Sequence, residues 1–416
     1  MGILAGFSCT QGQESSATLR DSGFSNWGGL MDQSYGHPSK KLSLYKDDSN
    51  PYIQEFNINM RAQYQMAAIS ANQGTHPGSD GFTDGWRRFR LGWNMQLFRD
   101  FKVANVWNIG GLPGTGQNRN GQWDHHRLTQ GNLYDAYVEY NAGNEVKVAV
   151  GKTLPMYMAE NRKSSAKYDL PEMAVLESGL ASSSSFGVWA TEEGAKERIW
   201  WQFGVWSNTE KYLRGTWGTW DGVNVLARVS CRMDEALLKE GRLYLDWNHN
   251  FDDRDDMLLQ KRDDRYVGSN AEDIVALYYV GKDGPWELTL QSLFGLQQAA
   301  YKSGKTVVAP DNVYGFTVMP TYMVTPNVQA VLRYQWAAGD NGIKMPSNYT
   351  TTLVPTQGSY VDRYQAIALG VNFFVYSEVP DRLKIAAMAE YGNSHLKEGA
   401  GGFTGWTFIV GVYTNF

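Results

Sequence analysis

The sequence predicts an all-β fold, a sixteen-stranded antiparallel transmembrane β-barrel with short periplasmic turns and long extracellular loops. Three observations predict it. The stretch Phe56 to Ala68, FNINMRAQYQMAA, alternates apolar and polar residues, which gives a strand one apolar and one polar face. The alternation there lasts longer than the roughly five or six residues of most soluble strands, and a transmembrane strand needs about nine to eleven. Long and short connections alternate between stretches of this kind, as they do in outer-membrane barrels.

The barrel is predicted over residues 51–416. In its second strand, Leu91 and Trp93 share one face and Arg88 and Arg90 share the other. Glycine, proline, asparagine and aspartate mark the connections between strands. The sixteen strands are predicted at residues 53–69, 86–98, 101–109, 131–140, 146–152, 185–191, 199–207, 222–231, 241–250, 271–281, 286–297, 313–323, 327–337, 362–374, 382–391 and 405–416.

The two ends of the chain are expected on the periplasmic side, because the number of strands is even. The last strand ends at Phe416, and such a terminal residue resembles the signal read by the barrel-assembly machinery. Residues 1–50 are predicted to be an export remnant and a loose periplasmic segment. The stretch MGILAGFS has no basic start and only a short apolar run, so we expect a signal peptide that is missing or truncated. Lipidation of Cys9 is left open.

Composition excludes several other classes of protein. No stretch holds the roughly eighteen consecutive apolar residues of a transmembrane helix. The net charge of −5 argues against a general nucleic-acid binder. Cys9 and Cys231 are the two cysteines, and their positions indicate neither a disulfide framework nor a metal site. Asp124-His125-His126 and the acidic run at 252–256 lack the spaced partners of a metal site, so we expect no metal and no cofactor.

The charged residues of the strands predict the character of the bore. A closed sheet leaves no free edge in lipid, and sixteen strands enclose a water-filled bore, so passage of small solutes is the expected function. Strand parity aims basic residues inward at Arg61, Arg88, Arg90, Lys147, Arg198, Arg228, Arg242, Arg333, Arg363 and Lys384. The acidic residues found in the same way are Asp135, Glu139, Asp246, Glu287 and Glu390. The basic excess favours anions, unless these residues are ion-paired parts of the wall.

Three segments resemble the phosphate-selective porin O and P family. They are WRRFRLGWNMQLFRDFKVANVWNIG at 86–110, LYDAYVEYNAGNEVKVAVGK at 133–152 and SSAKYDLPEMAVLES at 164–178. Arg61, within MRAQY, also matches a family position. The resemblance is clearest between about residues 55 and 190. It implies a sixteen-stranded barrel, usually a homotrimer, whose third outside loop folds into the bore. Residues 153–184 are the candidate constriction loop.

The resemblance also implies an anion path lined by arginines, lysines and serines. Arginine binds oxyanions bidentately, and serine hydroxyls can replace water around an anion. A pair of adjacent arginines in the family matches Arg87 and Arg88. The alternation of side chains along the strand alone would turn Arg87 toward lipid. Its place at the site therefore requires a β-bulge. Together with the inward-facing Arg61 and Arg90, the candidate pore and anion-binding residues are Arg87, Arg88, Asp135, Arg162, Lys163, Ser164, Ser165 and Lys167.

One departure from the family bears on the solute. The phosphate-selective members have an arginine directly after the glutamate that ends the loop region, and here the pair is Glu177-Ser178. One predicted anion ligand is therefore missing, and the solute stays open.

We expect an outer-membrane porin of a Gram-negative-type bacterium, not an enzyme. It would pass small anions, phosphate or polyphosphate among them, by diffusion. A porin for sugars or carboxylates is the alternative, with Tyr137, Trp200 and Trp206 as a sugar-binding surface. An outer-membrane enzyme or adhesin is an alternative of another class. The expected partners are small anions, outer-membrane lipid and lipopolysaccharide, the barrel-assembly machinery and two further copies in a homotrimer, with no nucleic acid.

Overall fold

The computed structural model describes most of the predicted barrel. The described residues are 42–415 except 74–75, 111–131, 166, 183, 194–197, 208–221, 252–270, 299–310, 345–359, 378 and 396–402. Cys9, the Asp124-His125-His126 stretch, the acidic run at 252–256 and Phe416 lie outside these residues.

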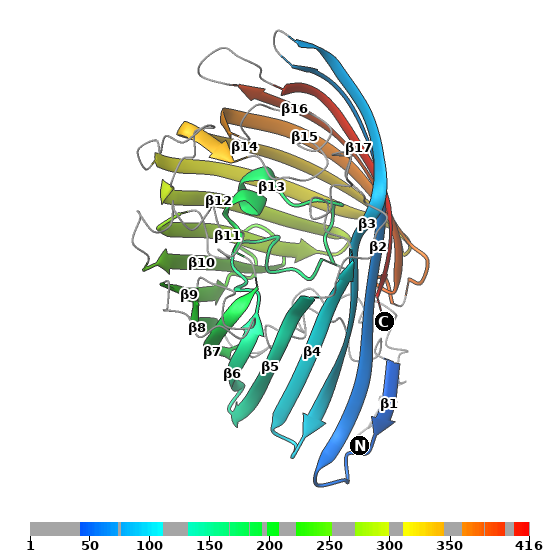
Figure 1. The fold of residues 1–416 in the computed structure, drawn as a ribbon, viewed down its shortest axis with the longest axis vertical. Helices are drawn as coiled ribbons and strands as arrows, with labels where there is room; N and C mark the ends of the chain where they lie inside the picture. The colour runs from blue at the N-terminus through cyan, green and yellow to red at the C-terminus, as the bar shows by residue number, and fades with distance from the viewer. Residues whose placement is uncertain are drawn as a thin grey trace, which may run out of the picture.

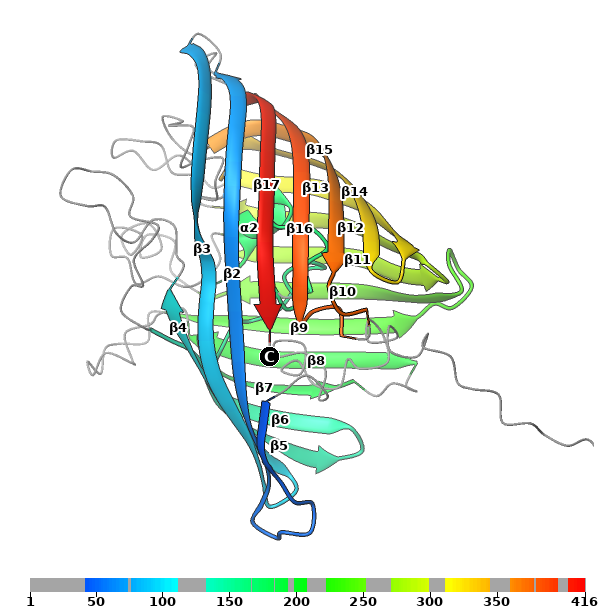
Figure 2. The ribbon, with the colours of Figure 1, turned by 90° about the vertical axis from the view of Figure 1, so that its right-hand side faces the viewer.

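Sixteen strands form one closed antiparallel barrel (Figures 1 and 2). Each strand pairs with the next one in the sequence, and β17 pairs with β2 to close the sheet. Closure gives every strand edge a partner, which a sheet in lipid requires. The strands are β2 (Ile53–Gln73), β3 (His76–Leu97), β4 (Phe101–Gly110), β5 (Asn132–Gly143), β6 (Val146–Thr153), β7 (Ser185–Glu192), β8 (Ile199–Ser207), β9 (Val223–Arg232), β10 (Glu240–Asn250), β11 (Asp273–Asp283), β12 (Trp286–Gln298), β13 (Asp311–Thr325), β14 (Val328–Lys344), β15 (Tyr360–Phe374), β16 (Leu383–His395) and β17 (Phe403–Asn415).

The predicted strand count and strand positions are confirmed, and the main difference is the length of the first hairpin. The sequence predicts a polar loop at residues 70–85, because Pro77 and several glycines interrupt the alternation of side chains. In the structure, β2 and β3 continue through this stretch, with Ala71 opposite Ser79. Backbone pairing therefore extends the two strands beyond the part whose side chains alternate.

A short additional strand precedes the barrel. β1 (Leu42–Lys46) pairs with β2 between Glu55 and Ile58, whereas β17 pairs with β2 only from Arg61 onward. β1 thus continues the line of β17 beyond its C-terminal end, as Figure 2 shows. It belongs to the segment 1–50 that the sequence predicts to be loose, and the rest of that segment lies outside the described residues.

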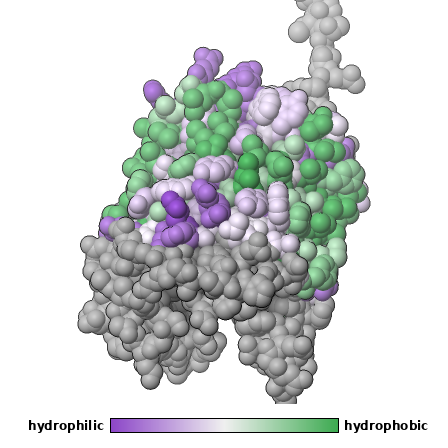
Figure 3. Space-filling model, turned by 90° about the horizontal axis from the view of Figure 1, so that it is seen from above, coloured by the Kyte–Doolittle hydropathy of each residue, from purple (hydrophilic) through white to green (hydrophobic). Residues whose placement is uncertain are grey.

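Side chains alternate across the barrel wall. On β17, Phe408, Val410 and Val412 are exposed on the outside, while Thr407 and Ile409 are buried on the inside. Figure 3 shows hydrophobic patches on the face that it draws. A wall that is apolar outside and mostly polar inside is the pattern of a transmembrane barrel.

The connection between β6 and β7, residues 154–184, runs inside the barrel (Figures 1 and 2). We call it the inner loop. It contains α2 (Val175–Leu180), a helix of six residues. No helix in the described part of the chain is long and apolar enough to cross a membrane.

Inward-pointing side chains of the wall hold the backbone of the inner loop. Asp246 accepts a hydrogen bond from the Met158 N–H (2.8 Å), and Arg228 donates one to the Met156 carbonyl oxygen (2.7 Å). On the other side, Gln335 accepts one from the Val175 N–H (2.7 Å). Further donors are Asn372 to the Asp169 carbonyl oxygen (2.7 Å) and Lys384 to the Tyr168 carbonyl oxygen (2.6 Å). These bonds satisfy buried backbone groups that no sheet pairs.

Three glycines in the wall make room for leucines of the inner loop. A side chain at Gly295, Gly315 or Gly370 would meet the side chain of Leu180, Leu176 or Leu170, respectively. All three leucines are almost fully buried. The fit of the loop against β12, β13 and β15 therefore depends on the missing side chains.

We expect Gly370→Val to lower the free energy of unfolding by about 1–3 kcal/mol, because overpacking forces Leu170 off the wall. Urea unfolding in detergent, followed by tryptophan fluorescence, measures this. Adding Leu170→Ala should recover part of the loss, since the smaller side chain leaves space for the valine. A Gly370→Val protein as stable as the wild type would show that the loop is not packed in this way.

Candidate functional site

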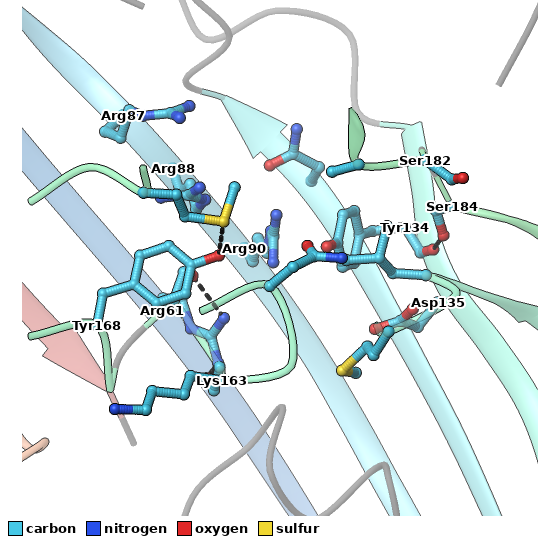
Figure 4. Close-up of a pocket in the computed structure, with 18 of the residues that line it drawn as sticks. Arg61, Arg87, Arg88, Arg90, Tyr134, Asp135, Lys163, Tyr168, Ser182 and Ser184 are labelled. Atoms are coloured by element: carbon cyan, nitrogen blue, oxygen red, sulfur yellow. Dashed lines mark hydrogen bonds between the residues drawn. The ribbon is translucent and has the colours of Figure 1, made fainter. Parts of the chain in front are cut away.

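A cavity of about 400 Å³ lies between the inner loop and the wall made by β2 to β6 (Figure 4). Eight of the ten predicted site residues line it, namely Arg61, Arg87, Arg88, Arg90, Asp135, Lys163, Ser164 and Ser165. Residues that the sequence did not single out also line it, among them Tyr134, Lys152, Tyr168 and Met173. The cavity is the place where the predicted cations meet the loop.

A β-bulge aims Arg87 into the barrel. Gln63 of β2 pairs with Arg88, but its neighbour Tyr64 pairs with Trp86, so Arg87 is an extra residue in β3. The bulge that strand parity required for Arg87 is therefore present, and both arginines face inward (Figure 4). Two adjacent arginines in an otherwise alternating strand were the signal in the sequence.

A second bulge places Tyr134 at the cavity. Val106 of β4 pairs with Asp135, and Trp107 pairs with Leu133, which leaves Tyr134 as the extra residue in β5. Its ring lies against the Arg90 guanidinium, with 3.5 Å from the Arg90 Cζ to the ring centroid. Strand alternation alone places Tyr134 on the lipid side, so no pattern in the sequence indicated this contact.

Arg61 joins the wall to the serine pair of the inner loop. It donates hydrogen bonds to the hydroxyl oxygens of Ser164 (2.7 Å) and Ser165 (2.9 Å). The Gln63 side-chain amide donates to the Ser165 carbonyl oxygen (2.9 Å). The two serines and Arg61 are thus brought together as the sequence predicts, and their mutual bonds fix this part of the loop against β2.

The four arginines of the cavity differ in their partners. Arg87 forms a bidentate pair with Glu172 of the loop, at 2.7 and 3.1 Å. Arg88 donates to the Gln63 side-chain oxygen (2.9 Å) and lies 5.7 Å from the Tyr168 ring centroid. Within the described residues, neither Arg88 nor Arg90 forms an ion pair with a carboxylate. These two side chains are therefore the cations best placed to meet an anion.

Lys163 lines the cavity but its charge is already paired. Its amine lies 2.6 Å from Asp169 and 3.2 Å from Glu287, and Figure 4 shows it pointing away from the arginines. Burial alone would lower the pKa of Lys163, but the two carboxylates outweigh it and raise the pKa above its ordinary value. Lys163 therefore stays charged and paired with Asp169 of the loop and Glu287 of the wall.

The two remaining predicted residues, Arg162 and Lys167, do not line the cavity. Arg162 is buried against the opposite wall, where it donates to the Tyr278 hydroxyl (3.1 Å) and lies over the Tyr244 ring (4.5 Å). Lys167 is partly exposed elsewhere on the loop. Consecutive residues of an irregular loop point in different directions. The nearness of Arg162 and Lys167 to the serine pair in the sequence therefore did not bring their side chains to the cavity.

Strand parity is wrong for Arg363. This residue is exposed and shares its face with the exposed Ile367 and Leu369, while Tyr364 is buried on the inside. Both faces of β15 carry apolar residues, so the pattern of hydrophobic residues in the sequence did not show which face of this strand points into the barrel.

The aromatic residues proposed for sugar binding are buried. Tyr137, Trp200 and Trp206 are 3%, 2% and 0% exposed. They pack with apolar residues of the inner loop in one core, and Trp206 stacks on Trp189 at 5.9 Å between ring centroids. These rings support the loop and offer no surface for a sugar.

A buried pair of carboxylates lies within the inner loop. Glu160 accepts a hydrogen bond from the Ala174 N–H (2.7 Å) and pairs with Arg333 (3.3 Å). Glu177, on α2, accepts bonds from the Asn161 N–H (2.6 Å) and the Gln291 amide (3.0 Å). Burial, and then the neighbouring Glu160, raise the pKa of Glu177 to about 8.

Protonation of Glu177 should therefore stabilise the folded chain. Its contribution is complete below the ordinary carboxyl pKa of about 4.3 and is lost as the pH rises through the raised pKa. We expect Glu177→Gln to be less sensitive than the wild type to a rise from about pH 5 to about pH 8. Urea unfolding at both pH values gives the comparison, and an equal loss of stability in the two proteins would exclude this role.

The comparisons with known proteins agree with this architecture. Residues 56–223 match the model of the family described as phosphate-selective porin O and P. Among curated proteins, no relative matches this chain in sequence.

Several solved outer-membrane channels share the fold. The chain is similar to the outer membrane channel DcaP of Acinetobacter baumannii, with 12% identity, a TM-score of 0.54, and coverage of 89% of this chain and 99% of that one. It is similar to Salmonella typhi OmpF in complex with daunomycin, with 11% identity, a TM-score of 0.56, and coverage of 90% and 100%. It is also similar to Pseudomonas putida OprB at high pH, with 11% identity, a TM-score of 0.50, and coverage of 87% of this chain and 94% of that one. At these identities the likeness shows the fold alone. The chain therefore has the barrel fold of these outer-membrane proteins, and its residues 56–223 match the phosphate-selective porin O and P family.

Proposed function

We propose that this porin passes small anions in preference to cations, and that they pass through the cavity between the inner loop and β2 to β6. The observation that carries the proposal is the pair Arg88 and Arg90. Both line the cavity, and neither forms an ion pair with a described carboxylate. Rings of arginine favour anions in pores, and a narrow site with low-dielectric walls strengthens the effect.

The inner loop acts as the constriction in this proposal. It contacts β2 through Arg61, β3 through Arg87 and the opposite wall through Arg333. The loop thereby leaves the space beside β2 to β6 as the path past the arginines. The homotrimer, the contacts with lipid and lipopolysaccharide, and insertion by the barrel-assembly machinery are carried over from the family resemblance as parts of the proposal.

Phosphate is one solute that this site could hold, because Arg61, Arg88 and Arg90 converge there and Ser178 adds a hydroxyl. The sugar alternative has less support, since the proposed aromatic surface is buried. Anions as a class are therefore the better-supported solutes.

The reversal potential in a planar bilayer under a KCl gradient tests the proposal. We expect an anion-selective reversal potential, and a reduced single-channel current when phosphate is added. Cation selectivity would overturn the proposed function. Anion selectivity without a phosphate effect would keep the anion porin and exclude phosphate as a specific solute.

A further inference from the structure

The cavity has two chemically different sides. β2 and β3 contribute arginines, whereas the inner loop contributes serine hydroxyl groups together with the apolar side chains of Leu154, Met173 and Ala181. These three side chains are partly exposed, although most described residues of the loop are buried. Leu154 and Ala181 also pack on the core behind them, so they form a fixed apolar surface. The loop therefore presents apolar side chains as well as serine hydroxyl groups to the cavity that the cations line.

Such a cavity suits an organic anion better than an inorganic one. An inorganic oxyanion can use the arginines and the serine hydroxyl groups, but it gains nothing from the apolar side chains beside them. An organic anion with a single acidic group can place that group at Arg88 and Arg90. Its apolar body can then lie against Leu154 and Met173, and burial of this body is favourable. Methionine adapts its shape to such a body.

Flat groups beside the arginines favour a planar body. The Arg90 guanidinium lies on the Tyr134 ring, and this contact fixes the orientation of the guanidinium plane. The Tyr168 ring lies beside Arg88, and its hydroxyl contacts the Met173 sulfur at 3.2 Å. Rings stack on guanidinium planes and on other rings, and methionine sulfur contacts ring edges favourably. The volume of about 400 Å³ exceeds what a phosphate ion alone would fill.

We propose that the cavity is a binding site for organic anions that carry an acidic group on a planar apolar body, of which aromatic carboxylates are the simplest. This inference rests on the proposed anion path and adds the class of solute that the path binds.

Block of the single-channel current by benzoate, acetate and inorganic phosphate tests this proposal. In the wild type, we expect benzoate to block at a concentration about tenfold below acetate and phosphate, because only benzoate buries a ring. Met173→Gln keeps the length of the side chain and removes its apolar character. This variant should weaken the block by benzoate several-fold and leave the block by acetate unchanged.

Met323→Gln is the matched control, because Met323 is partly exposed on β13 and does not line the cavity. It should behave as the wild type with all three anions. Equal block by benzoate and acetate in an anion-selective channel would overturn the inference and leave the proposed function intact. A cation-selective channel would instead show that the proposed function itself fails.

Discussion

Replacing Arg88 and Arg90 together by glutamine should lower the ratio of anion to cation permeability by about tenfold. Both guanidinium groups line the cavity, and no described carboxylate forms an ion pair with them. Charges in a narrow space with low-dielectric walls act strongly on a passing ion, whereas charges in open water are screened. The reversal potential under a KCl gradient measures the change directly.

Arg232→Gln is a suitable control for this double variant. Arg232 lies at the end of β9, where its side chain is 45% exposed and pairs with Asp234. Its removal takes away a positive charge without changing the cavity, so the selectivity should stay that of the wild type. An unchanged reversal potential in the Arg88 and Arg90 variant would mean that ions bypass the cavity.

Replacing Arg333 by methionine should destabilise the protein by about 3–5 kcal/mol, the usual effect of leaving buried charges without a partner. The Arg333 guanidinium lies 3.3 Å from Glu160 of the inner loop and 3.1 Å from Glu390 of β16, and it donates to the Glu172 carbonyl oxygen (2.7 Å). Without it, two carboxylates remain buried, and the loop loses one of its connections to β14. We therefore also expect a larger single-channel conductance.

The triple variant Arg333→Met, Glu160→Gln and Glu390→Gln separates charge from packing. It removes both carboxylates together with the arginine, so it should recover part of the stability. Arg363→Met, on the exposed face of β15, serves as the control and should change neither property. Wild-type conductance and stability in Arg333→Met would contradict the role of this ion network.

The barrel could be predicted from the sequence because its determinants are local. Alternation indicates which residues face lipid on most strands, and glycine and proline mark most of the connections, so the strands lie close to their predicted positions. The bulge at Arg87 could be anticipated, since two adjacent arginines conflict with alternation. The bulge at Tyr134 could not be anticipated, because an aromatic residue is also common on the lipid-facing side of a barrel.

The charge of the bore was harder to predict, because parity says which residues face inward but not what they pair with. Arg228 points inward as predicted, but it forms a 2.6 Å ion pair with Asp246 and lies under the loop. Arg87 pairs with Glu172, which is distant in sequence. The path of the inner loop decides these pairings, and that path depends on contacts with strands across the whole barrel. Arg88 and Arg90 could therefore be separated from the other basic residues only in the folded structure.

Chemical modification of a cysteine at position 178 tests the proposed path most directly. Ser178→Cys, with Cys9 and Cys231 replaced by serine, places a thiol of similar size on the loop side of the cavity. Ala174→Cys is the control, because Ala174 is buried in the same loop and does not line the cavity. A bulky methanethiosulfonate reagent should reduce the single-channel current of Ser178→Cys in steps and leave that of Ala174→Cys unchanged. A full current through fully labelled Ser178→Cys channels would contradict a path between the inner loop and the arginines of β3.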